Sequence, residues 1–216
     1  MDFKSGKELL ELCAREQLPV SAVMKQREIT CGSLSGEEID KKLDTVLSIM
    51  REAVHEPLRN PKKSIGGLIG GEARKVADFE KTSRSICGPL VGRAIAYSMA
   101  VLEVNSSMGL IVAAPTAGSS GVLPGVLLAL QEERELANED MFKGLLHASA
   151  IGYLLMRNAS VSGAEAGCQA EVGAASAMAA GAVVEIMGGT PEMSLQAASL
   201  AISNLLGMVC DPIAGL

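Results

Sequence analysis

The sequence has almost no aromatic residues and no cluster of basic ones. It contains no tryptophan, two tyrosines and three phenylalanines, and its 19 lysines and arginines are outnumbered by 25 aspartates and glutamates, for a net charge of -6. Nucleic-acid binding depends on basic groups that neutralise phosphates and on aromatic rings that stack on bases. Because both are scarce, we expect no nucleic-acid partner.

Long hydrophobic runs are also missing. A membrane-spanning helix needs about 20 apolar residues in succession, so we expect no membrane association. The first residues, Met1 to Lys4, do not show the charged and then apolar pattern of a signal segment. The most apolar stretches are interrupted by Arg93, Glu103, Asn105, Glu185 and Asn204.

The five cysteines do not form a recognisable pattern. Their spacing is irregular and contains no CxxC pair, which excludes a disulfide framework and the common zinc-binding spacing. Reduced thiols are the better interpretation, and they indicate a cytoplasmic protein.

The apolar content that is present comes from small and aliphatic side chains. Hydrophobic residues make up 48% of the 216-residue chain, which also holds 23 glycines. This content excludes a disordered chain and allows one large domain or two small ones. The core must be built from Ala, Val, Ile, Leu and Met, packed closely through small residues.

The first 56 residues read as an amphipathic helical arm. Ser5 is suited to cap a first helix, and Ser35 precedes Gly36 and two glutamates in the manner of a second helix start. We expect this helix to end at Glu56-Pro57. Its apolar stripe recurs at steps of three or four residues and consists of Ile39, Leu43, Val46, Met50 and Val54.

Residues 57–216 are predicted to form the catalytic core of an all-α, compact helical bundle rich in alanine and glycine. Thr190, followed by a proline at the first helical position, predicts a capped helix start. The last two helices are apolar on most faces, and we expect both to be buried. The predicted helices cover residues 74–83, 92–107, 126–130, 138–156, 170–187 and 191–208.

Two loops between these helices are candidates for ligand binding. The segment 57–71 is rich in glycine and proline and includes Lys62 and Lys63, and it reads either as a carboxylate-binding loop or as a flexible connector. The segment Pro115 to Gly121 carries Thr, Ser and Gly before a helix, where free N–H groups and hydroxyls favour an anion. A tight turn with a helix cap is the alternative for this second loop.

Two cysteines and two histidines are the other candidates. Cys168 and Cys210 each lie beside glycines at a predicted helix end, where N–H groups can point at a sulfur-bound cluster, although a lone cysteine is often a small buried hydrophobe. Cys13 reads as a core residue. His55 suits a surface or interface position, and His147 is either a base or a core histidine with its hydrogen bonds made.

Five segments, taken in order, closely resemble the iron-sulfur-dependent L-serine dehydratases, and more narrowly the alpha subunit of the two-chain form. The resemblance spans most of residues 60–216, and the first 56 residues match more loosely. The segments are 63–71, 103–109, 115–125, 158–173 and 204–215.

The resemblance implies a lyase that converts L-serine to pyruvate and ammonia at a 4Fe-4S cluster, with one iron open to act as a Lewis acid. Cys168 and Cys210 fall on two of three cluster-ligand positions. The third position follows the segment 211–216, so the chain is expected to be truncated before that cysteine and inactive alone.

The resemblance also implies which residues bind the substrate and which partner completes the enzyme. The family's proposed base is a histidine of the beta subunit, so the catalytic base of this chain stays unknown. We expect a complex with that subunit, and the stripe at 39–54 suggests an exposed face for a homodimer or heterodimer. The substrate carboxylate is assigned to Thr116, Gly118, Ser119, Ser120, Gly121 and Lys63.

Two other functions stay open from the residues alone. A pyridoxal phosphate-dependent serine or threonine dehydratase would use the segment 119–121 for phosphate and Lys63 or Lys143 for the Schiff base. A non-catalytic helical scaffold would use the glycines only for close packing.

Overall fold

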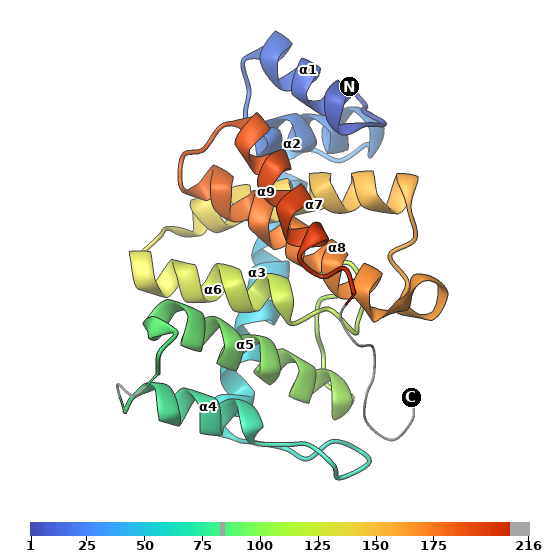
Figure 1. The fold of residues 1–216 in the computed structure, drawn as a ribbon. Helices are drawn as coiled ribbons and strands as arrows, with labels where there is room; N and C mark the ends of the chain where they lie inside the picture. The colour runs from blue at the N-terminus through green and yellow to red at the C-terminus, as the bar shows by residue number, and fades with distance from the viewer. Residues whose placement is uncertain (83–84, 208–216) are drawn as a thin grey trace. The chain divides into compact units, whose positions relative to one another are not determined.

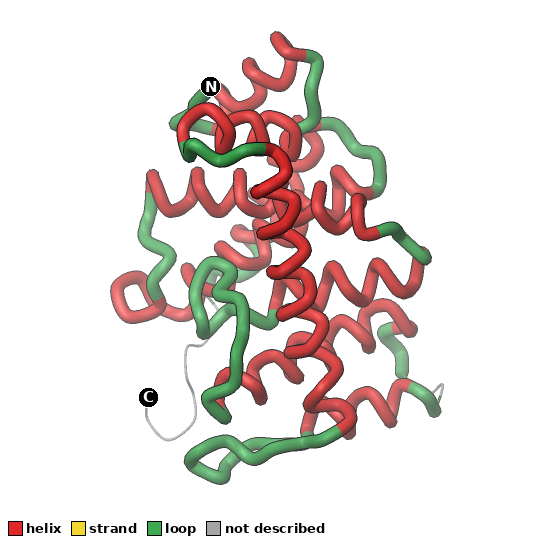
Figure 2. Tube along the Cα trace, turned by 180° about the vertical axis from the view of Figure 1, so that it is seen from behind, coloured by secondary structure: helices red, strands yellow, loops and turns green. Residues whose placement is uncertain are grey.

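The computed structural model describes residues 1–82 and 85–207, and the regular secondary structure of this part of the chain is helical. Helices joined by loops, with no strand among the described residues, confirm the all-α prediction (Figure 2). No helix in this described part is long and apolar enough to cross a membrane. The helices are α1 (Gly6–Glu16), α2 (Val20–Cys31), α3 (Gly36–Arg59), α4 (Glu72–Glu80), α5 (Gly88–Ser106), α6 (Val122–Arg134), α7 (Asn138–Asn158), α8 (Gly163–Ile186) and α9 (Pro191–Ser203).

The chain divides into two compact units. Unit 1 comprises Met1–Asp44 and Asn138–Leu216, and unit 2 comprises Thr45–Ala137. These limits differ from the boundary at 56/57 that the sequence suggested, because residues 1–44 pack with the C-terminal helices rather than forming a separate arm. The assignment of 57–216 as the catalytic core is a functional prediction, and it stays one.

Local signals explain where several helices begin. Ser5 Oγ accepts a hydrogen bond from the Glu8 N–H, and Thr190 Oγ1 accepts one from the Met193 N–H, so both predicted caps are confirmed. Ser35 and Glu38 form a reciprocal capping box at the start of α3, with hydrogen bonds of 2.8 and 3.2 Å.

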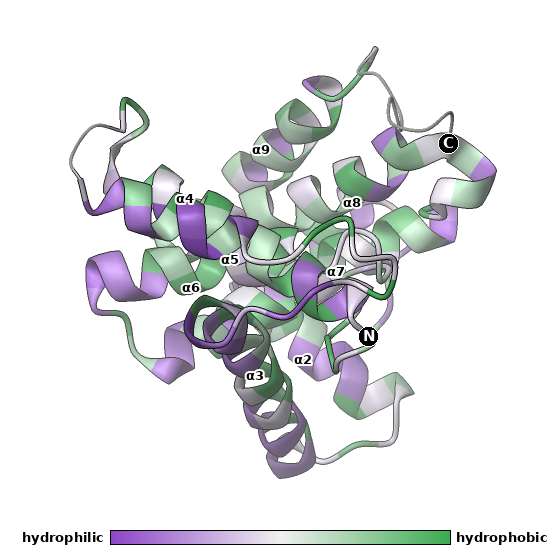
Figure 3. Ribbon diagram, turned by 90° about the horizontal axis from the view of Figure 1, so that it is seen from below, coloured by the Kyte–Doolittle hydropathy of each residue, from purple (hydrophilic) through white to green (hydrophobic). Residues whose placement is uncertain are grey.

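Helix α3 differs from its prediction in length and in the exposure of its stripe. It continues through Pro57 to Arg59 instead of ending at Glu56, because a proline in the last turn removes only one of the final hydrogen bonds. Hydrophobic residues recur among hydrophilic ones along it (Figure 3). Ile39, Met50 and Val54 are buried and the other two stripe residues half-buried, so the expected exposed face is wrong.

Unit 1 is built on contacts of α8 with α7 and α9, and of α2 with α7 (Figure 1). Its core includes Phe3, Leu9, Val20 and Met24, together with Cys13, which is 4% exposed as predicted for a core residue. The prediction that α9 is buried is wrong, since α9 exposes several of its apolar side chains, among them Met193 and Leu200.

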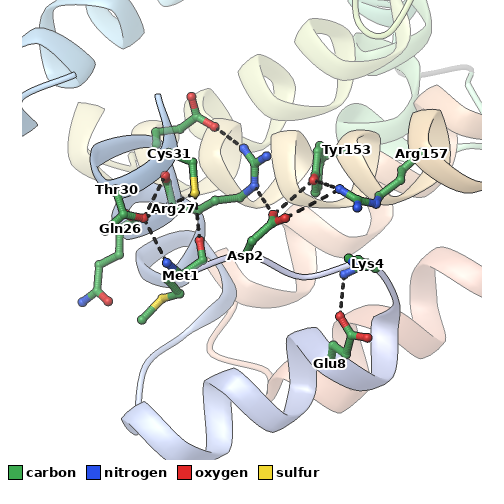
Figure 4. Close-up of polar contacts among 11 residues, drawn as sticks. Met1, Asp2, Lys4, Glu8, Gln26, Arg27, Thr30, Cys31, Tyr153 and Arg157 are labelled. Carbon is green, nitrogen blue, oxygen red and sulfur yellow. Dashed lines mark hydrogen bonds and ion pairs between the residues drawn. The ribbon is translucent and has the colours of Figure 1, made fainter. Parts of the chain in front are cut away.

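A polar network ties the N-terminus into unit 1 (Figure 4). The Asp2 carboxylate accepts hydrogen bonds from Arg27 Nε at 2.9 Å and from the Tyr153 hydroxyl at 3.1 Å. The Arg27 guanidinium lies over the Tyr153 ring, 3.8 Å from its centre. The bond from Arg27 is the main reason that the pKa of Asp2 lies below its usual value.

Unit 2 depends on the close approach of α5 and α6. A Cβ added to Gly121 would lie 2.3 Å from Ser98 O, and one added to Gly125 would lie 2.1 Å from Ser98 Oγ. Real Cβ contacts are longer than this, so these glycines allow the two helices to touch through backbone atoms.

We predict that Gly125→Ala destabilises the protein, whereas a matched helical glycine does not. Overpacking against Ser98 is expected to lower the free energy of unfolding by about 1–3 kcal/mol. In the control Gly173→Ala, the new Cβ meets its nearest atom at 3.6 Å, and helix propensity should raise stability by about 0.5–1 kcal/mol. Urea unfolding measures both changes, and equal effects of the two substitutions would refute the packing argument.

Candidate functional site

The hydroxyl-rich loop joins α5 to α6 in unit 2. Asn105, at the end of α5, donates from Nδ2 to Ala117 O at 3.3 Å. The hydroxyls of Thr116 and Ser119 lie 3.0 Å apart, and Ser120 Oγ donates to Ala117 O at 2.7 Å. The loop is therefore a turn that its own hydroxyls hold together before α6 begins.

The predicted substrate residues of this loop differ in accessibility. Ser119 and Ser120 are 2% and 0% exposed, while Thr116 is half-buried and Gly118 is exposed. A ligand can reach Thr116 and Gly118 directly, whereas Ser119 can act on it only through Thr116. Gly121 is buried against Ser98, which gives it a packing role whether or not its N–H binds a ligand.

The glycine-rich loop before α4 is a closed turn. The Ser64 N–H donates to Ile69 O at 2.9 Å, and the Ile69 N–H donates to Ser64 Oγ at 3.3 Å. Gly70 has φ +147°, and a Cβ on it would lie 2.4 Å from Lys62 O. Lys63 is exposed next to this turn, so the loop is not an unstructured connector.

The C-terminal end of α5 anchors both loops. Besides the bond from Asn105 to the hydroxyl-rich loop, the Ser106 carbonyl accepts a hydrogen bond from the Ile65 N–H at 3.1 Å. Lys63 and Thr116 thus belong to two turns that are tied to consecutive residues. The structure brings together two of the segments that the sequence singled out separately.

Glu103, one turn earlier on α5, is a buried carboxylate with a structural partner. It is 5% exposed, and its Oε1 accepts a hydrogen bond from the Ala73 N–H at 2.9 Å. Helix α4 has Gly71 at its N-cap and no local side-chain cap, so Glu103 supplies the missing acceptor. Its Oε2 is buried and has no hydrogen-bond partner.

Unit 1 contains a second carboxylate of this kind, which sequence reasoning missed. Glu185 Oε2 accepts from the Ser21 N–H at 3.2 Å and lies 2.7 Å from His147 Nδ1. Because a carboxylate only accepts, His147 donates from Nδ1. Helix α2 has Pro19 at its N-cap and no side-chain cap of its own. A lone acidic residue near the end of the apolar run 172–187 was the available sequence signal.

The two histidines are thereby placed in structural roles. His147 is fully buried, and a Cβ on Gly181 would lie 2.8 Å from its Nε2, so it is a core histidine held by Glu185. His55 is half-buried against Tyr97 and lies 3.5 Å from Glu132. Burial lowers the pKa of His55. The Nε2 atom of His147 is buried and has no hydrogen-bond partner, so the hydrogen bonds expected of a core histidine are only partly made, and a substrate in solvent does not reach the ring.

Cys168 follows a break in α8. Gly167 has φ +82° inside the run assigned to this helix, so Cys168 begins the long segment that continues to Ile186. The N–H groups of a first helical turn favour negative charge, as expected for this cysteine. The Gly207 N–H donates to Gln169 Oε1 at 3.3 Å, which brings the end of the described chain next to Cys168.

The described residues do not contain a complete metal site. No group of three His, Cys, Asp or Glu side chains within residues 1–82 and 85–207 could hold a metal ion. Cys210, the second predicted ligand, lies outside the described residues. Burial raises the pKa of Cys13 to about 11, which makes it a poor thiolate ligand, while Cys31 and Cys87 are exposed.

Comparison with known proteins gives a consistent set of relatives. Residues 15–216 match the family model described as serine dehydratase alpha chain. A protein of Bacillus subtilis named probable L-serine dehydratase, alpha chain, is 44% identical over 214 residues, which cover 99% of this chain and 71% of the relative. The L-serine dehydratase alpha chain of Peptoniphilus asaccharolyticus is 41% identical over 99% of this chain and 73% of its own length.

A longer relative shows the same similarity over part of its chain. The L-serine dehydratase of Streptomyces coelicolor is 39% identical over 221 residues, which cover 99% of this chain and 47% of the relative. The region similar to this chain is thus about half of that protein.

We predict that Glu185→Gln lowers the free energy of unfolding at pH 7 and makes that free energy less dependent on pH below 4.5. Burial raises the pKa of Glu185, but the hydrogen bonds from His147 and Ser21 outweigh it and hold the pKa below the ordinary value of 4.5. Stabilisation by Glu185 is therefore complete above about pH 4.5 and is lost as the pH falls through the folded-state pKa. At pH 7 the variant should lose about 2 kcal/mol of unfolding free energy.

Denaturant unfolding between pH 7 and pH 3 tests this prediction. The loss of stability of the wild-type protein below pH 4.5 should be partly absent in Glu185→Gln. The exposed Glu37→Gln variant serves as the control and should follow the wild-type curve. Parallel pH curves for the wild-type protein and Glu185→Gln would contradict the assigned role.

Proposed function

The chain belongs to the serine dehydratase alpha-chain family, and we propose that it forms the part of an L-serine dehydratase that binds the substrate and holds its cofactor. The enzyme is a lyase that converts L-serine to pyruvate and ammonia. The observation that carries the assignment is a family match over residues 15–216, which includes both loops anchored at the end of α5.

The substrate carboxylate is proposed to bind at the hydroxyl-rich loop. The Thr116 hydroxyl and the Gly118 N–H are the accessible donors, and Ser119 orients Thr116 from 3.0 Å behind it. Ser120 and Gly121 keep the turn in shape and complete the predicted set. Lys63, on the second anchored turn, adds a positive charge for the same carboxylate.

A 4Fe-4S cluster is the proposed cofactor, with Cys168 and Cys210 as two of its ligands. A thiolate at a helix start suits iron-sulfur chemistry, and the Gly207 N–H donates to Gln169, the residue after Cys168. When bound, the cluster supplies an open iron that acts as a Lewis acid on the substrate hydroxyl. Thiolate ligands require a reducing compartment, which fits a cytoplasmic location.

The remaining catalytic group is proposed to come from a beta chain. Removal of the α-proton needs a base, and neither histidine of this chain is suited to that role, since His147 is enclosed and His55 contacts Tyr97 and lies near Glu132. The alpha-chain relatives imply such a partner by name. Loss of water from serine then leaves an aminoacrylate, which hydrolyses to pyruvate and ammonia.

The pyridoxal alternative finds no suitable lysine. Lys143 is exposed and pairs with Asp140 at 2.9 Å, which raises the pKa of its ammonium group. A lysine that forms a Schiff base must lose its proton readily, and a lowered pKa serves that purpose. Lys63 is exposed and has no buried environment of its own.

We predict that Thr116→Val reduces catalysis without unfolding the protein. In the complex with the beta chain, loss of a hydroxyl that binds the carboxylate should lower kcat/KM for L-serine by about 10- to 100-fold. The exposed Thr82→Val variant in the same unit is the control and should retain activity. Serine-dependent pyruvate release measures the effect, and unchanged kcat/KM in Thr116→Val would remove this residue from the site.

We predict that Cys168→Ser abolishes cluster binding. Iron and sulfide should fall to background in the anaerobically purified complex, because a serine hydroxyl is a poor ligand for the cluster. Cys31→Ser, which changes an exposed thiol of the same unit, should keep the wild-type content. Full iron content in Cys168→Ser would exclude this residue as a ligand, and a wild-type complex without iron or serine-dependent pyruvate would favour a scaffold role.

A further inference from the structure

Unit 2 contains a cavity that the substrate loop does not use. Its volume is about 330 Å³, and it lies between the last turns of α3 and the segment that follows α5. Ala53, Val104, Met108 and Leu110 contribute its apolar wall. Ligand pockets range from about 300 to 1,000 Å³, so this one suits a small metabolite.

Glu103 is the residue of this cavity that lacks a full set of partners. Its Oε1 caps α4 through Ala73, but its Oε2 is buried without a hydrogen-bond partner. Buried carboxylate oxygens without partners are rare, because such a group gives up its hydration without compensation. A ligand that donates hydrogen bonds and carries positive charge would satisfy this oxygen.

The other charges of the cavity favour the same kind of ligand. Glu52 and Glu56 also line it, but Arg59 lies 3.7 and 3.6 Å from their carboxylates, whereas no described cation pairs with Glu103. Lys62 lies on the wall, and none of the ion pairs found among the described residues includes it. Glu52 and Glu56 share this one arginine, and Glu103 and Lys62 are the two charged lining residues that form no ion pair among the described residues.

We propose that this cavity binds a small free α-amino acid, with its ammonium group at Glu103 and its carboxylate at Lys62. A zwitterion of this type matches both unpaired charges, and a short side chain matches the apolar wall. Met108 and Leu110 are 79% and 70% exposed, so the apolar wall lies at the open side of the cavity. This proposal rests on the proposed function only in the choice of L-serine as one of the amino acids to be tested.

Calorimetry with the purified chain tests the proposal directly. L-serine and L-alanine should bind, L-lactate should not because a hydroxyl replaces its ammonium group, and ethanolamine should bind more weakly because it lacks the carboxylate. Glu103→Gln keeps an acceptor for Ala73 but loses the charge, and it should weaken L-alanine binding by about 10- to 100-fold. Lys62→Met changes an exposed side chain and should weaken it by about 10-fold.

Thr116→Val separates this cavity from the substrate loop. Thr116 does not line the cavity, so L-alanine should bind this variant as it binds the wild-type chain. The proposal is overturned if no amino acid binds, if L-lactate binds as well as L-alanine, or if neither Glu103→Gln nor Lys62→Met changes the affinity. These experiments measure binding only. A negative result would therefore overturn the proposed amino-acid site without contradicting the proposed function, which is tested by pyruvate formation in the assembled enzyme.

Discussion

The carboxylate of Glu103 is the contact on which unit 2 most depends. It reaches from α5 to the first turn of α4, where Gly71 cannot provide a cap. The next residues of α5 hold the two candidate loops through Asn105 and Ser106. One short stretch of helix therefore sets the start of α4 and both loops, so a shift of α5 would move all three together.

Unit 1 also contains a buried glutamate that caps a helix distant in the sequence. Glu185 crosses from α8 to the uncapped start of α2 and also orients His147. A buried carboxylate loses its hydration, and charge-assisted hydrogen bonds from backbone N–H groups compensate for part of that loss. In each unit the capping glutamate keeps one oxygen without a partner. Glu103 also lines the cavity next to α3, so it combines a structural contact with a place where a ligand can bind.

Small residues make these buried contacts possible in a chain with almost no aromatic core. Gly121 and Gly125 let α5 and α6 meet through Ser98, and Gly181 leaves room for the His147 ring. Close packing of this kind tolerates little extra volume. A glycine that the sequence suggests as a loop or ligand residue can therefore also be needed for helix packing. Gly121 is such a case, because it belongs to the predicted substrate loop and packs against Ser98.

The sequence by itself determined the helical class, the capped starts at Ser5, Ser35 and Thr190, and the identity of the two loops, because periodicity and caps are local properties. It could not determine the end of α3, the exposure of α9 or the partners of Glu103 and Glu185. The partners of the two glutamates lie 30 to 164 positions away from them in the chain. Only tertiary structure decides which distant backbone N–H a buried carboxylate meets, since hydrogen bonding requires the helices to have packed first.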